Sequence, residues 1–116
     1  IVTFMTESQV SEELRYKLLK KLQENPNMSQ RELAKCLGFS LGKMNYCLKA
    51  LVDAGLVKVG TFIRSNEKKG YSYLMTPSGL IEKTKVTTRV LENKQRQYQL
   101  LEQEIKQLEE EVFLAR

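Results

Sequence analysis

Side chains that can bind the bases and phosphates of DNA are concentrated between residues 42 and 49. Lys43, Asn45, Tyr46 and Lys49 lie within this short stretch. A lysine ammonium can donate to guanine O6 and N7, and an asparagine amide can pair with adenine through two hydrogen bonds. At 100° per residue, Gly42, Tyr46 and Lys49 share one helix face, flanked by Lys43 and Asn45. The spacing predicts a helix whose outer face enters a major groove.

The helix that must carry this face has an apolar opposite side. Ser40 can cap its first turn, and Gly55 ends it. The inner positions at helical spacing are Met44, Cys47, Leu48 and Leu51. We therefore expect this helix to pack on a core and to leave its basic, amide-bearing side exposed.

A shorter helix is expected just before it. Ser29 and Glu32 form a capping-box pattern, and Gly38 suits the left-handed residue that ends a helix. Its expected inner face consists of Leu33, Cys36 and Leu37. Two helices joined by a glycine-containing turn predict a helix-turn-helix over residues 29–54. The alternative is a plain helical hairpin in a core, which the strand pattern downstream makes less favourable.

The residues after this pair of helices indicate a β-hairpin. Residues 56–59 have the pattern of a strand that Gly60 is expected to break, and residues 61–64 are extended in type. Residues 65–70 form a polar loop, and residues 71–75 alternate as a returning strand. A hairpin in this position predicts a wing beside the second helix.

The tip of this hairpin is basic. Arg64, Lys68 and Lys69 are expected to reach a minor groove or the flanking phosphates. The alternative for these three residues is a solvated hairpin end with no ligand.

Two longer helices are expected to flank these elements. Residues 7–24 carry an apolar stripe and end before Pro26. Thr76 and Pro77 open a second helix that runs to Arg116. Its later heptads form an apolar seam, which consists of Leu91, Tyr98, Leu101, Ile105, Leu108 and Val112.

The seam predicts a homodimer, because a helix with such a stripe needs a partner. Lys94 interrupts the seam. The heptad positions that flank the seam are acidic, at Glu102, Glu104, Glu109 and Glu111. In a parallel pair, Glu104 would face Glu109 of the second copy. An antiparallel pair, or packing on the basic first helix of a second subunit, relieves this repulsion, and the orientation stays open.

Charge is unevenly distributed along the 116 residues. Residues 1–90 carry 15 Lys and Arg against 8 Asp and Glu, a net +7, whereas residues 91–116 carry 4 against 6, a net −2. A basic body favours a polyanionic partner. No membrane-spanning run or signal segment is evident, and Met5 is the expected natural start.

Histidine is absent, and the only cysteines are Cys36 and Cys47. Two thiols without histidine do not make an ordinary four-ligand zinc site, so no metal or other cofactor is expected. Both cysteines are expected to be small buried hydrophobes in a reduced cytoplasmic protein, with a redox-sensing pair as the alternative.

The string from Ser29 to Val59, followed by LMTPSG at 74–79, resembles the MarR-type winged helix-turn-helix regulators. The short chain and the long terminal helix are most similar to the small branch associated with bacterial exopolysaccharide (EPS) gene clusters. The resemblance implies a dimeric, nucleoid-associated transcription factor, often a repressor, that binds a pseudo-palindromic operator.

The resemblance also sets the expected architecture. The fold class is mainly α with a small β-hairpin: a winged helix-turn-helix DNA-binding domain over residues 6–76, then a coiled-coil dimerisation helix over residues 77–116. The wing departs from the usual Asp-x-Arg element, having Asn66-Glu67-Lys68-Lys69 there. The N-terminal segment is short, which leaves control by a small-molecule effector open.

The leading hypothesis is a sequence-specific regulator of double-stranded DNA. Its predicted phosphate contacts come from charged side chains and from capping hydroxyls with their helix amides. They are Arg31, Lys35, Lys49, Ser29 and Ser40. The alternative is a winged-helix adaptor that binds another protein through its coiled coil. An enzyme is not expected, because no nucleophile motif, phosphate loop or metal set is present.

Overall fold

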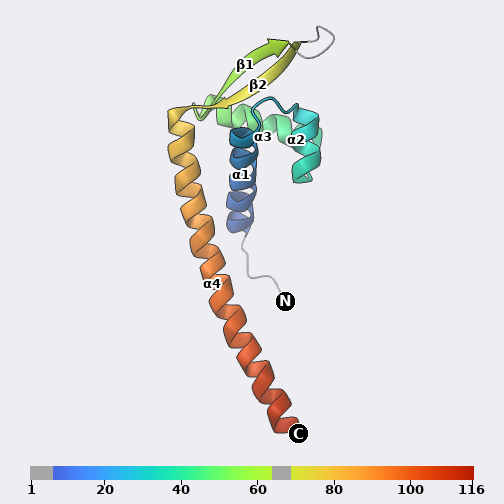
Figure 1. Ribbon diagram of the computed structural model, residues 1–116, viewed down its shortest axis with the longest axis vertical. Coiled ribbons are helices and arrows are strands. Elements are labelled where there is room, and N and C mark those ends of the chain that lie inside the picture. Colours follow the sequence, from blue (N-terminus) through green and yellow to red (C-terminus); the bar gives the residue numbers. More distant parts are fainter. Residues whose placement is uncertain (1–6, 64–68) are drawn as a thin grey trace.

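The computed structural model describes residues 7–63 and 69–116. Figure 1 shows a small head at one end of the molecule and one long helix that extends far beyond it. The principal extents are 70 × 29 × 21 Å. In chain order the elements are α1 (Glu7–Glu24), α2 (Gln30–Leu37), α3 (Leu41–Asp53), β1 (Val57–Ile63), β2 (Lys69–Met75) and α4 (Pro77–Ala115). The predicted fold class is confirmed: a mainly helical winged helix-turn-helix with a hairpin and a long final helix.

Side-chain caps begin α2, α3 and α4 where the sequence predicts them, at Ser29, Ser40 and Thr76. The backbone N–H of Glu32 donates to Ser29 Oγ at 3.1 Å, and the serine hydroxyl donates to Glu32 Oε1 at 3.0 Å. Ser40 accepts in the same way from the N–H of Lys43 at 3.1 Å. Gly38 has φ +71°, which an L side chain rarely adopts, so α2 ends there.

The core of the head joins α1, α2 and α3 to the root of the hairpin. Its largest fully buried side chains within the head are Leu19, Leu22, Leu33, Met44 and Leu48. Tyr73 of β2 is also buried, and its hydroxyl accepts from Gln30 Nε2 of α2 at 3.0 Å. The Tyr73 N–H donates to the Pro26 carbonyl at 2.9 Å. These bonds hold the root of the wing against the start of α2.

The expectation that Gly60 breaks the first strand is wrong. β1 is continuous, and Gly60 pairs with Ser72 in the antiparallel ladder. A Cβ at Gly60 would lie 3.2 Å from Ser72 Oγ, which is a tight contact that the serine side chain would have to relieve. Glycine weakens a strand locally, but the backbone bonds on both sides of Gly60 continue the pairing.

The prediction that both cysteines are buried is wrong for Cys36, which is exposed, while Cys47 is half-buried. The inner face of α2 is centred on Leu33 and Ala34, and Leu37 is half-buried beside them. Cys36 lies outside this buried face. The face of α2 that packs on the core is narrower than the apolar stripe of its sequence, which includes Cys36.

The first half of α4 packs along α1. Val86 of α4 is fully buried, and Asn93 is nearly so. Ion pairs line the contact, joining Glu12 to Arg89, Arg15 to Glu82 at 3.5 Å, and Glu13 to Lys94 at 3.2 Å. The predicted division of the chain at residues 76 and 77 therefore lies beside a packed contact, and it stays a prediction.

None of the helices in the described part of the chain combines the length and the apolar character needed to cross a membrane. Within residues 7–63 and 69–116, no group of three or more His, Cys, Asp or Glu side chains could hold a metal ion.

Candidate nucleic-acid interface

The outer face of α3 is exposed along its whole predicted length. Gly42, Lys43, Asn45, Tyr46 and Lys49 are all exposed, and Tyr46 is 76% accessible. The inner face of the same helix is closed, because its apolar positions are buried at Met44, Leu48 and Leu51. The structure therefore brings the predicted base-facing residues together on one surface.

The predicted phosphate contacts on α2 and at the helix starts lie at the surface as well. Arg31, Lys35 and Ser40 are exposed, and Ser29 is half-buried. The hydroxyls of both serines already cap their helices. A phosphate placed here would meet the helix amides and the basic side chains, with the positive end of each helix dipole toward it.

Lys43 makes a contact that the sequence does not reveal. Its Nζ lies 4.6 Å from the centre of the Phe39 ring, a cation–π geometry. Phe39 belongs to the turn between α2 and α3 and is half-buried. The turn residue thus holds the lysine ammonium near the start of α3. In the sequence, the only hint of this contact is an aromatic residue in the turn. The fold of the turn is what places the Phe39 ring next to the Lys43 ammonium.

Arg64 and Lys68 lie outside the described residues, and Lys69 is the first residue of β2. Their contacts with a minor groove or the flanking phosphates stay a prediction. The residue that sequence reasoning missed here is Gln30, whose amide ties the wing to α2 through Tyr73.

A cavity of about 210 Å³ lies between α1 and α3, beside the predicted DNA-binding surface. Apolar side chains form much of its wall, and Arg15 and Lys43 also line it. Its other lining residues include Leu14, Leu18, Phe39, Tyr46 and Cys47. Cys47 thus lines this cavity, whereas Cys36 lies on the exposed surface of α2.

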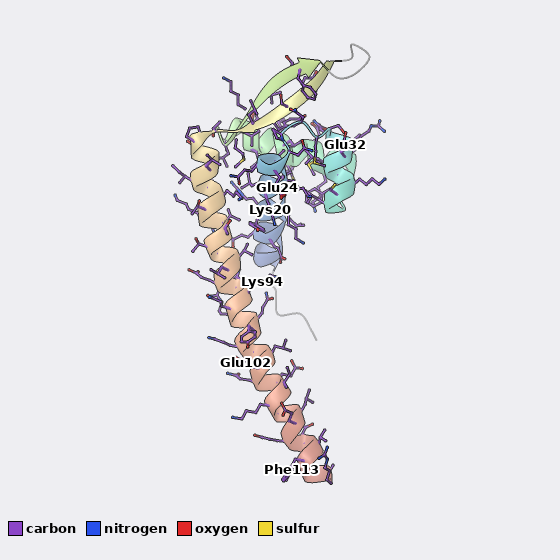
Figure 2. All side chains as sticks on the ribbon, in the orientation of Figure 1. Lys20, Glu24, Glu32, Lys94, Glu102 and Phe113 are labelled. Atoms are coloured by element: carbon purple, nitrogen blue, oxygen red, sulfur yellow. The ribbon has the colours of Figure 1, made fainter. Side chains whose placement is uncertain are left out.

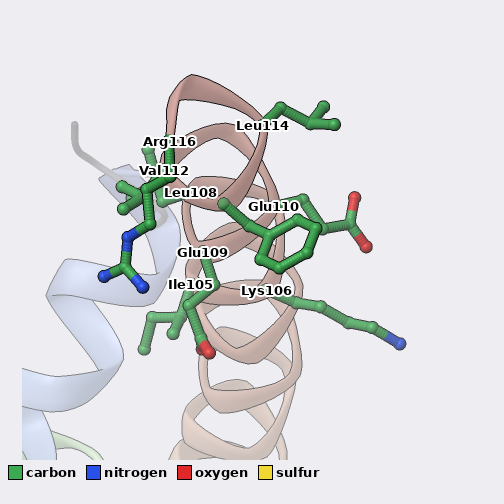
Figure 3. A pocket seen from close by; sticks show the side chains of 9 residues that line it. Ile105, Lys106, Leu108, Glu109, Glu110, Val112, Leu114 and Arg116 are labelled. Carbon is green, nitrogen blue, oxygen red and sulfur yellow. The ribbon is translucent and has the colours of Figure 1, made fainter.

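The apolar seam on α4 is uncovered in this single chain. Leu91, Tyr98, Leu101, Ile105, Leu108 and Val112 are each 46–63% exposed. Figure 2 shows Glu102 and Phe113 on the part of α4 that extends beyond the head. In Figure 3, Ile105 and Val112 project from one side of the helix end and Lys106 and Glu110 from the other. The hollow there is lined by residues of the last turns of α4 and by Arg116, which follows the helix.

Comparison with known proteins agrees with this geometry. Residues 11–58 match a family described as winged helix-turn-helix DNA-binding. No curated protein matches the chain.

Solved structures of transcriptional regulators share the fold. The regulator SlyA is 22% identical, with 96% of this chain and 73% of that chain covered and a TM-score of 0.62. The Mycobacterium tuberculosis MarR family protein Rv2887, in complex with p-aminosalicylic acid, is 20% identical, with 90% and 84% covered and a TM-score of 0.60. The PcaV regulator from Streptomyces coelicolor, with its natural ligand, is 15% identical, with 95% and 78% covered and a TM-score of 0.60. At these identities the similarity establishes the fold.

Proposed function

We propose that this chain is a MarR-type transcriptional regulator that binds a pseudo-palindromic operator in double-stranded DNA as a homodimer. The observation that carries the proposal is the exposed Lys43, Asn45 and Tyr46 on the second helix of a winged helix-turn-helix. The family match over residues 11–58 and the regulators that share the fold support it. A protein-binding adaptor would have no need for this basic, amide-bearing face.

Each polar residue has a proposed role. Asn45 and Lys43 contact base edges, and Tyr46 contacts bases or nearby phosphates. Arg31, Lys35 and Lys49 bind phosphates and set the register of the protein on the duplex. The apolar seam of α4 holds the two subunits together, so that each subunit presents one α3 to one half-site.

The long α4 supports a place in the EPS-associated branch, and we propose with it a role as a repressor of EPS genes. The direct test is a gel-shift titration with the DNA upstream of its own gene. A retarded complex that competitor DNA of unrelated sequence does not displace supports the proposal. Equal displacement by specific and unrelated competitors would contradict a sequence-specific regulator.

Binding should weaken steeply with salt, because phosphate contacts release counterions from DNA. Arg31, Lys35 and Lys49 give six contacts in a dimer, and each contributes a slope of about −0.9 in log K against log salt. The affinity should then fall by about 10³-fold between 50 and 200 mM salt. Fluorescence anisotropy with a labelled duplex measures this slope, and a flat curve would contradict an electrostatic interface.

Asn45 and Lys49 should differ in what they contribute to DNA binding. Replacing Asn45 with Ala should cost about 1–3 kcal/mol on the preferred sequence and relax the preference at one base position. Replacing Lys49 with Ala should weaken all sequences about equally and make the salt slope shallower. Titration against a set of single-base operator variants separates the two. Identical specificity profiles for both variants would show that the face assignment is incorrect.

A further inference from the structure

The long helix α4 starts on a hydrogen-bonded joint formed by Gly55, Leu56, Thr76 and Gly79. The Thr76 N–H donates to the Leu56 carbonyl at 3.1 Å. The Thr76 hydroxyl donates to the Gly55 carbonyl at 2.7 Å and accepts from the Gly79 N–H at 3.0 Å. One threonine therefore caps α4 and also links it to a different part of the chain.

The other side of the joint is bonded to the end of α3. The Gly55 N–H donates to the Val52 carbonyl, and the Leu56 N–H donates to the Leu51 carbonyl, both at 3.0 Å. Gly55 has φ +75°, which favours glycine at this turn. The N–H groups of Gly55 and Leu56 thus donate to carbonyls in the last turn of α3. The carbonyls of the same two residues accept hydrogen bonds from Thr76, the N-cap of α4.

The joint is also closely packed. Gly79 is buried, and a Cβ built on it would lie 2.0 Å from the Leu56 carbonyl oxygen. Real Cβ atoms essentially never come this close to another heavy atom. The first turn of α4 therefore rests directly on the backbone that follows α3, with no side chain between them.

We propose that Thr76 is a positioning residue, which fixes the direction of α4 relative to α3 and thereby the distance between the two half-sites that a dimer reads. This inference rests on the proposed function. It follows from the joint, because the helix that reads DNA and the helix that carries the seam meet through backbone bonds that Thr76 completes.

The length of α4 makes its direction important. Ile105 of the seam lies 26 residues beyond Gly79, about 39 Å along the helix at 1.5 Å per residue. A tilt of about 5° at the joint moves that point by about 3.4 Å, which is the rise of one base pair. The buried Val86 and the partly exposed ion pairs to α1 also restrain the first half of α4, but the seam from Tyr98 onward lies beyond these contacts and follows the direction in which α4 leaves the head. Small changes at Thr76 should therefore change half-site spacing.

The test selects DNA with the full chain from a library of duplexes that contain 40 random base pairs. Wild-type protein is compared with Thr76→Asp, which keeps an acceptor for the Gly79 N–H but has no proton to donate to Gly55. Thr76→Ser keeps both bonds. Thr88→Asp adds the same charge to α4 at an exposed threonine whose hydroxyl donates to the Thr84 carbonyl of the same helix. Thr76→Val, which loses both bonds, is a second variant, and circular dichroism checks the fold of each.

Wild-type protein, Thr76→Ser and Thr88→Asp should enrich paired half-sites at one spacing. Thr76→Asp and Thr76→Val should enrich the same half-site sequence spread over three or more spacings. Their affinity for the wild-type spacing should be about tenfold lower, with unchanged affinity for a single half-site. A single, unaltered spacing for both Thr76 variants would overturn the inference, as would equal broadening by Thr88→Asp. Wild-type protein that enriches no paired half-sites would contradict the proposed function itself, and the inference with it.

Discussion

Replacing Ile105 with Asp is expected to convert the protein to a monomer and to weaken binding to a two-half-site operator by at least about 100-fold. Ile105 lies in the middle of the apolar seam and is 47% exposed in the single chain. In a dimer the carboxylate would be buried without a partner, at a cost that the contact cannot offset. Loss of the second subunit removes the intramolecular second contact, which is worth about 10²–10⁴ in affinity.

The matched control is Gln103→Asp, which adds the same charge to an exposed position of α4 outside the seam. This variant should stay dimeric and bind as wild type. Analytical ultracentrifugation gives the oligomeric state, and anisotropy titrations against one-site and two-site duplexes give the affinities. An Ile105→Asp protein that sediments as a dimer would show that another surface forms the interface.

Replacing Gly79 with Ala should destabilise the protein by about 2–4 kcal/mol, the range of a severe overpacking substitution. The added methyl would meet the Leu56 carbonyl oxygen at 2.0 Å and Met75 Cε at 3.4 Å. The methionine side chain can move, but the carbonyl belongs to the backbone that joins α3 to β1. The first turn of α4 must therefore shift away from the head.

Urea unfolding followed by circular dichroism measures the loss of stability, and Gly42→Ala is the control. Gly42 is also helical, but a Cβ there would meet no atom within 4 Å. Alanine at position 42 should therefore raise stability by about 0.5–1 kcal/mol. If Gly79→Ala were as stable as Gly42→Ala, the close approach of α4 to Leu56 would not exist in solution.

The helix ends could be predicted because local chemistry determines them. Ser29, Ser40 and Thr76 satisfy amides three residues ahead, and Gly38 takes the left-handed conformation. Each of these signals lies within a few residues of the atoms that it bonds. The exposed face of α3 could be predicted for the same reason, since the period of a helix determines which side chains share a side.

Contacts between distant residues could not be predicted in this way. Cys36 has the spacing of an inner residue, but the position of α2 on its neighbours decides which arc is covered. Gly60 has the local character of a strand breaker, and only its pairing with Ser72 explains why β1 continues. The bond between Gln30 and Tyr73 joins residues 43 apart in sequence, with no local signal in either residue.

The packing of α1 against α4 has a consequence for the order in which the chain folds. Its polar contacts join residues 77 and 81 positions apart, at Arg89 with Glu12 and at Lys94 with Glu13. Leu19 and Leu22 share one buried cluster with Leu33 of α2 and Met44 of α3, and forming this cluster closes much shorter loops, which cost less chain entropy. During synthesis, the first three helices can therefore associate while α4 is still inside the ribosome, and α1 must keep one side open until the last helix emerges.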